Sequence, residues 1–235
     1  MLMKLLTSII VFVLYLIPSE SFAQGGYHFG LKGGPTLANQ NWDGFERRYA
    51  LTYNISGFVE SRDPEDRGSL FAQLGLHNRG SSVGLFGFRS RRNYNFKNIS
   101  LLLGAKKAVD TELLGAKPYY FLGIRGEYTL AHNLVEMFEF FENILFNNPQ
   151  IMNAGSLLVE PAFVRRWNYG ISIGGGFEFS GTEFFNPALE FTISPDLSYQ
   201  YQRFPNSISP FETQVRNVSF EISLVLRFLR EIVYE

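Results

Sequence analysis

Histidine is the side chain that most often serves as a general base near neutral pH, and it occurs three times, as His28, His77 and His132. Nucleophilic hydrolysis needs a nucleophile, a base and an orienting group within mutual reach. His77 with Ser81 or Ser82 is the only short-range pairing of this type. The Gly-x-Ser-x-Gly pattern occurs at residues 80–84 and 170–174, but both stretches lie inside predicted strands and not at a strand-to-helix turn, and there is no His-Glu-x-x-His motif. We therefore predict no catalytic residues, no cofactor and no metal site. A barrel enzyme acting on lipid or peptide is kept as the alternative.

The composition narrows the classes of protein further. Twenty-one Lys and Arg residues stand against 22 Asp and Glu, and the largest basic group is Arg89, Arg91 and Arg92, so the basic patch of a nucleic-acid binder is missing. Cysteine is absent, which excludes disulfides and thiol chemistry. Aromatic residues reach 16%, with 24 Phe and 12 Tyr. No apolar run after Ile17 is long enough for a membrane helix, so membrane insertion would require a β-barrel.

The first residues resemble a secretory signal peptide. Lys4 precedes an almost uninterrupted apolar run over residues 5–17, Pro18 breaks the run, and small residues stand at Ser21 and Ala23. The alternative is a single membrane anchor, but the run is shorter than the roughly 20 residues that a helical span needs. We predict a signal peptide over residues 1–23, cleaved after Ala23, and one domain over residues 24–235.

Polar and apolar residues alternate with a period of two over long stretches. Residues 167–180 alternate strictly, and in residues 217–228 only Val225 breaks the pattern. Strands of soluble proteins usually run about five or six residues, whereas a strand tilted across a bilayer needs about nine to eleven. The length of these strands therefore favours a membrane barrel. A soluble β-sandwich or lipocalin-like barrel is the alternative, and it leaves the Gly-, Ser- and charge-rich face unexplained.

The same period predicts eight strands, which is an even number and therefore brings both termini to the periplasmic side. The predicted class is all-β: an eight-stranded antiparallel transmembrane β-barrel. Three of its four outer connections are expected to exceed every periplasmic turn, and aromatic residues at the strand ends, Tyr201 among them, are expected to form two interfacial belts. The predicted strands are residues 27–37, 50–61, 69–84, 93–106, 117–131, 167–180, 187–202 and 215–229.

Charged residues occur on the face of these strands that points into the barrel. Because a buried charge without a partner is costly, we expect them to pair across the lumen. Proton or ion passage is the alternative reading, although an eight-stranded lumen is packed with side chains and leaves little room for a pore. The predicted network consists of Lys32, Glu60, Lys106, Arg125, Glu127, Glu178, Glu190, Glu221 and Arg227.

The third outer connection has a different period. Its apolar residues fall at helical spacing, with acidic residues on the other side, which predicts a short amphipathic helix. We expect this helix to form a lid over the barrel mouth, with docking of a partner protein as the alternative. Insertion into the outer leaflet is disfavoured because the helix lacks a basic face. The apolar positions are Leu134, Met137, Phe138, Phe141 and Leu145.

Three segments carry a resemblance to a known family. The segments 29–37, Phe-Gly-Leu-Lys-Gly-Gly-Pro-Thr-Leu, and 117–128, Lys-Pro-Tyr-Tyr-Phe-Leu-Gly-Ile-Arg-Gly-Glu-Tyr, together with the closing strand 218–228, resemble outer-membrane β-barrel proteins of the PorT-like type from Bacteroidetes. The resemblance implies an eight-stranded barrel and an outer-membrane address. It implies no activity, although the namesake subgroup is tied to protein secretion.

Together these patterns predict a non-enzymatic outer-membrane protein with a structural, scaffolding or assembly role in the cell envelope, linked to protein secretion through the resemblance. We expect it to act through its extracellular loops. The expected partners are outer-membrane lipids and other envelope or secretion proteins, and no nucleic acid.

Overall fold

The computed structural model describes residues 26–41, 46–62, 68–84, 91–113, 115–134, 161–181, 185–203 and 212–230. The predicted signal peptide, residues 1–23, lies outside these ranges. So does the predicted loop helix except for Leu134; its positions Met137, Phe138, Phe141 and Leu145 therefore stay predictions. The described part contains one short 3-10 turn, η3 (Pro161–Phe163). No helix among the described residues is long and apolar enough to cross a membrane.

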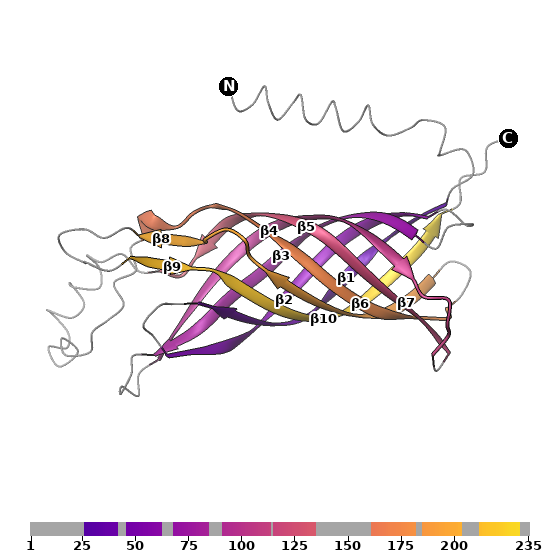
Figure 1. The fold of residues 1–235 in the computed structure, drawn as a ribbon, viewed down its shortest axis with the longest axis horizontal. Coiled ribbons are helices and arrows are strands. Elements are labelled where there is room, and N and C mark those ends of the chain that lie inside the picture. The colour runs from indigo at the N-terminus through magenta and orange to yellow at the C-terminus, as the bar shows by residue number, and fades with distance from the viewer. Residues whose placement is uncertain are drawn as a thin grey trace, which may run out of the picture.

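Eight long strands close into an antiparallel barrel, as the sequence predicts (Figure 1). Around the wall the order is β1-β10-β7-β6-β5-β4-β3-β2, and β1 closes the barrel by pairing with β10 from Tyr27–Arg230 to Gln40–Asn217. We call the end where β1 begins and β10 ends the terminal end, and the opposite end the loop end. The strands are β1 (Gly26–Gln40), β2 (Glu46–Arg62), β3 (Gly68–Gly84), β4 (Arg91–Ala108), β5 (Ala116–His132), β6 (Trp167–Phe179), β7 (Phe185–Pro195) and β10 (Asn217–Arg230).

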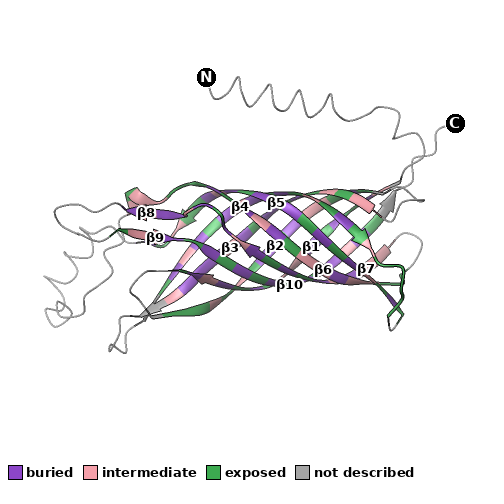
Figure 2. Cartoon of the chain, viewed as in Figure 1, coloured by how far each residue is buried: buried purple, intermediate pink, exposed green. Residues whose placement is uncertain are grey.

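Burial alternates along each strand, with the polar side chains inside. On β10, Glu221 and Ser223 are buried, whereas Ile222 and Leu224 are exposed on the outer surface. Figure 2 shows the same alternation of buried and exposed residues along the other strands. Successive side chains of a strand point to opposite faces, so the period-two sequence pattern becomes a polar interior and an apolar exterior.

β7 ends earlier than the sequence pattern predicts, at Pro195 instead of near residue 202. Proline has no backbone N–H to continue the ladder, and the pairing of β7 with β6 already stops at Ile193. The chain then runs irregularly along β6, where the Leu197 amide donates to the Tyr169 carbonyl oxygen at 3.0 Å. It re-forms a strand as β8 (Tyr201–Arg203), which pairs with β9 (Thr213–Val215) in a two-stranded hairpin at the loop end (Figure 1).

Two of the four loop-end connections are shorter than predicted. Connection 41–45 is no longer than the terminal-end connection 109–115, so the expectation that three of the four exceed every terminal-end turn is wrong for this one; connection 85–90, the expected exception, is also shorter than 109–115. The strands continue further because their inward polar groups find partners at the loop end. There the Ser81 hydroxyl donates to Gln40 Oε1 at 3.0 Å. Only connections 133–166 and 196–216 are long.

An apolar cluster lies at the loop end. Tyr201 was expected in an interfacial belt, but it is 1% exposed and packs inside this cluster, so that expectation is wrong for Tyr201. The reason is the early end of β7, because β8 starts a new strand beyond it. Leu134 is buried in the same cluster. The members are Tyr94, Phe96, Leu134, Tyr201 and Val215, with Phe163 and Val164 packed against them.

A second apolar cluster lies inside the barrel and accounts for the break in the β10 pattern. Val225 is buried against rings from β5, which fill space between the polar groups of the lumen. The Phe71 and Phe121 rings meet edge to face, with centroids 5.6 Å apart. The cluster contains Tyr119, Phe121, Ala188 and Val225, with Phe58 and Phe71 packed against it.

Candidate functional site: the buried charges of the lumen

The predicted lumen charges all lie on the inward face, where they form two groups. The terminal-half cluster consists of Lys32, Glu60, Lys106, Glu178, Glu190 and Arg227. The loop-half cluster consists of His77, Arg79, Arg125, Glu127, Asp196 and Glu221.

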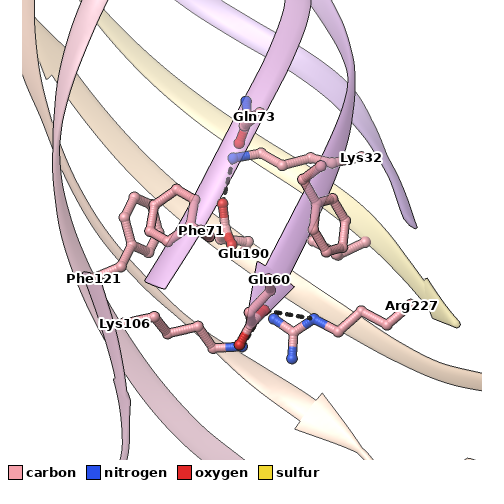
Figure 3. Close-up of a pocket in the computed structure, with 10 residues that line it drawn as sticks. Lys32, Glu60, Phe71, Gln73, Lys106, Phe121, Glu190 and Arg227 are labelled. Carbon is pink, nitrogen blue, oxygen red and sulfur yellow. Dashed lines mark hydrogen bonds and ion pairs between the residues drawn. The ribbon is translucent and has the colours of Figure 1, made fainter. Parts of the chain in front are cut away.

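In the terminal-half cluster three cations face three carboxylates. Lys32 forms an ion pair with Glu190. Lys106 Nζ lies 3.0 Å from Glu60 Oε1, and Glu60 Oε2 lies 3.9 Å from Arg227 Nε. Figure 3 shows Glu60 between Lys106 and Arg227, which come from β4 and β10. The formal charges therefore balance within this cluster, as a site removed from water requires.

Tyr119 contacts three members of this cluster. Its hydroxyl donates to Glu190 Oε2 at 2.9 Å, while Lys106 Nζ lies 4.1 Å and Arg227 Cζ 4.9 Å from its ring centroid. Cations over an aromatic face are attracted by the ring quadrupole, more strongly when desolvated. A small pocket adjoins the cluster (Figure 3). It is lined by Lys32, Phe58, Glu60, Phe71, Gln73, Lys106, Phe121, Glu190, Val225 and Arg227.

Arg79 is the centre of the loop-half cluster and is 1% exposed. Its Nη2 lies 3.1 Å from Glu127 Oε1 and 3.9 Å from Glu221 Oε1, and its Nη1 lies 3.4 Å from Asp196 Oδ1. Arg125 shares two of these carboxylates: its Nε lies 3.1 Å from Glu127 Oε1, and it also pairs with Asp196. Each guanidinium therefore serves more than one carboxylate.

The remaining members of the loop-half cluster are held by neighbouring polar groups. His77 Nδ1 lies 3.3 Å from Glu221 Oε1. The Asn217 side-chain amide donates to Asp196 Oδ2 at 2.8 Å, and that of Asn98 donates to Glu127 Oε2 at 3.3 Å. Buried carboxylates are stabilised when such donors satisfy their free lone pairs.

The Arg79–Asp196 contact spans the barrel. Arg79 lies on β3, and Asp196 directly follows the last residue of β7. In the closed order of eight strands, β3 and β7 are four positions apart, so the two residues come from opposite walls of the barrel. A direct side-chain pair between opposite walls fills the lumen at this level. The interior of an eight-stranded barrel is just wide enough for its own side chains. The charges thus form a packed core and not the lining of a wide channel.

Sequence reasoning missed Arg79 and Asp196, the two most central members of the loop-half cluster. The signal was present, because Arg79 lies on the same parity as Gln73, His77 and Ser81, all of them polar. Asp196 likewise continues a polar parity through β7 and beyond it. Both residues lie inside the predicted strands 69–84 and 187–202, so applying the same alternation to every charged residue of these strands would have found them.

In the structure His77 and Ser81, the candidate catalytic pair, each have another hydrogen-bond partner. His77 contacts Glu221, and the Ser81 hydroxyl donates to Gln40. Within the described ranges, no group of three or more His, Asp or Glu side chains is placed to hold a metal ion. These polar residues belong to the packing of the lumen.

Comparisons with known proteins give structural likeness without a family. No family model matches the chain, and no curated protein matches its sequence. The solved structures that the chain resembles include outer membrane protein OprG from Pseudomonas aeruginosa, which is 13% identical over 88% of this chain and 96% of that one, with a TM-score of 0.46. Neisserial surface protein A is 13% identical over 86% and 96%, with a TM-score of 0.43. Outer membrane protein AlkL is 9% identical over 91% and 94%, with a TM-score of 0.45. At these values the likenesses assign no function.

Replacing Arg227 with glutamine is expected to destabilise the barrel by about 3 kcal/mol, because Glu178 and Glu60 then lose a cation in a buried site. The measurement is the urea midpoint in detergent, followed by heat-modified gel mobility. Lys117→Gln removes a cation from an exposed position of β5 and serves as the control, with an expected change within about 0.5 kcal/mol. Equal midpoints for the two variants would show that the lumen pairs contribute nothing to stability.

Proposed function

We propose that this chain is an outer-membrane β-barrel protein with a non-enzymatic structural, scaffolding or assembly role, and that it acts through its loop end. The observation that carries the proposal is the inverted distribution of side chains. Charged and polar residues are buried inside, while leucine, isoleucine, valine and aromatic side chains are exposed on the outer wall.

The outer wall suits hydrocarbon and not water. Exposed apolar side chains occur on all eight barrel strands, among them Leu31, Ile55, Leu74, Leu103 and Ile124. Soluble monomers rarely expose contiguous apolar patches larger than a few hundred Å². A closed barrel also pairs its backbone groups within the wall, which is the condition for crossing a bilayer with strands.

Aromatic side chains at the two ends of the wall support the same location. Trp167 and Tyr169 are exposed at the loop end, and Phe29 stacks on Phe228 at the terminal end with centroids 5.7 Å apart. Aromatic belts of this type lie at the two membrane–water interfaces. In bacterial barrels the termini face the periplasm, so we place the loop end outside the cell.

A filled lumen directs function to the surfaces. The cross-barrel contact of Arg79 with Asp196 disfavours a pore, and the long connections 133–166 and 196–216 both leave from the loop end. We propose that envelope proteins bind there. The resemblance of residues 29–37 and 117–128 to the PorT-like type makes components of protein secretion the first partners to test.

The test is site-specific photocrosslinking in intact cells, followed by mass spectrometry of the captured proteins. A photoreactive residue at Glu212, exposed at the loop end, is expected to capture a defined envelope protein. The same residue at Leu113, exposed in the terminal-end connection, is the matched control and is expected not to capture it. Capture at neither position, in a barrel that fractionates with the outer membrane, would contradict the scaffolding role.

A second measurement addresses the pore alternative. Purified barrel in planar bilayers is expected to give no single-channel steps, because side chains from opposite walls meet inside it. Stable steps of porin size would contradict a filled lumen.

A further inference from the structure

Three arginines lie close together at the loop end, on one side of the barrel. The Arg165 amide donates to the Gln200 carbonyl oxygen at 2.9 Å, and the Gln200 amide donates to the Val215 carbonyl oxygen at 2.8 Å, directly before Arg216. The Arg166 carbonyl oxygen accepts from the Thr129 amide of β5 at 2.7 Å. Backbone hydrogen bonds thus hold all three positions on neighbouring chain segments. We call Arg165, Arg166 and Arg216 the arginine arc.

Two of the three side chains are oriented by aromatic residues. Arg166 Nη1 donates to the Tyr128 hydroxyl at 3.2 Å, and the Tyr128 ring packs edge to face on Trp167 with centroids 5.0 Å apart. Arg216 Cζ lies 4.2 Å from the centroid of Tyr199. A guanidinium stacked in this way is pre-oriented, and its N–H groups stay available to an oxyanion.

The arc differs from the buried arginines of the lumen in its lack of neutralising partners. Arg79, Arg125 and Arg227 each pair with two or more carboxylates. Within the part of the chain that the structure describes, the arginines of the arc form no ion pair with a carboxylate and are exposed. In a protein of net charge −1 they are a local concentration of unpaired positive charge.

Directly below the arc, the outer wall is aromatic and apolar. Trp167 is 74% and Tyr169 61% exposed, and Leu197 is exposed beside them. A free anion would use the arginines alone, and this apolar surface would be left without a partner. An amphiphile with acyl chains below and phosphate above would contact both parts.

We infer that the arginine arc binds the phosphate groups of a lipid headgroup in the outer leaflet, with the acyl chains lying against Trp167, Tyr169 and Leu197. The inference rests on the proposed outer-membrane location. Arginine suits this ligand because its planar fork donates two parallel hydrogen bonds to phosphate. It names outer-leaflet lipid as a bound partner, whereas the proposed function concerns envelope proteins.

The test uses the folded full-length barrel in detergent, with bis-phosphorylated lipid A titrated in and the bound fraction read by native mass spectrometry. The triple variant R165Q/R166Q/R216Q is expected to weaken binding at least about ten-fold. The matched control K97Q/K107Q/K117Q removes three exposed cations elsewhere and is expected to change binding less than about two-fold. Lipid A without phosphates should bind equally weakly to the wild type and to the triple variant.

Three results would overturn the inference: equal binding by wild type and triple variant, equal loss in the control triple, or full displacement of lipid by millimolar inorganic phosphate. The last would identify a site for free anions. If the triple variant did not fold, the single variants R166Q and R216Q would be measured, each with an expected loss of about three-fold. Folding of each variant is checked by heat-modified gel mobility. Cell fractionation tests the membrane location separately, so a failure of lipid A binding does not by itself contradict that location.

Discussion

Replacing Arg79 with methionine is expected to destabilise the barrel by about 3–5 kcal/mol, because three buried carboxylates lose their shared cation. Arg125 alone then faces Glu127 and Asp196, and Glu221 is left with His77. Methionine retains much of the volume, so the loss reports the charge and not a cavity. The measurement is the free energy of unfolding from urea titration in detergent.

Arg166→Met is the control for this substitution, because it removes an exposed arginine and is expected to change stability within about 0.5 kcal/mol. Adding Glu221→Gln to Arg79→Met removes one of the three carboxylates that lose Arg79, and is expected to recover part of the loss. The double-mutant cycle then gives the coupling between the two residues. Wild-type stability of Arg79→Met would refute the account of the loop-half cluster as a structural core.

Replacing Ile124 with arginine is expected to destabilise the protein in a bilayer by about 2–4 kcal/mol, as for a cation on the lipid face near the midplane. Ile124 is 67% exposed on the outer wall, and its register partners on the neighbouring strands are Leu103 and Ile171. The change therefore places a charge in the middle of the apolar band. The measurement is the urea midpoint of protein folded into lipid vesicles.

Leu113→Arg makes the same chemical change in the terminal-end connection, where Leu113 is 53% exposed, and is expected to be nearly neutral. If both variants were neutral, the outer wall at Ile124 would face water. The membrane location would then fail, and the phosphate-lipid inference with it.

The strand count was predictable because each strand carries its own signal. The strict alternation over residues 167–180 and 217–228 indicated two strands, and β6 and β10 occupy Trp167–Phe179 and Asn217–Arg230. The end of β7 was not predicted. The alternation continues past Pro195 through Asp196, Ser198 and Gln200, and these residues are buried, although the barrel ladder has already ended. In residues 196–200 the side chains therefore keep alternating inward and outward although the backbone no longer pairs as a barrel strand.

The lumen site was predictable in part. Parity alone placed Lys32, Glu60, Glu190 and Arg227 on the inward face, where the structure has them. It did not predict which of them pair. Lys106 pairs with Glu60, and Arg79 pairs with Asp196, which directly follows β7. In both pairs the partners lie on parts of the wall that are not adjacent.

Along the eight barrel strands, the sequence by itself determined which residues share a face, because successive Cβ atoms of a strand alternate and this rule needs no distant contact. Only the tertiary structure decided the meeting of Arg79 with Asp196, the burial of Tyr201 and the position of the arginine arc. Closure of β1 on β10 sets the stagger of the strands, and the stagger decides which residues share a level of the barrel. The sequence indicated which charged residues point inward. The geometry of the closed barrel then brings these residues together into a filled core.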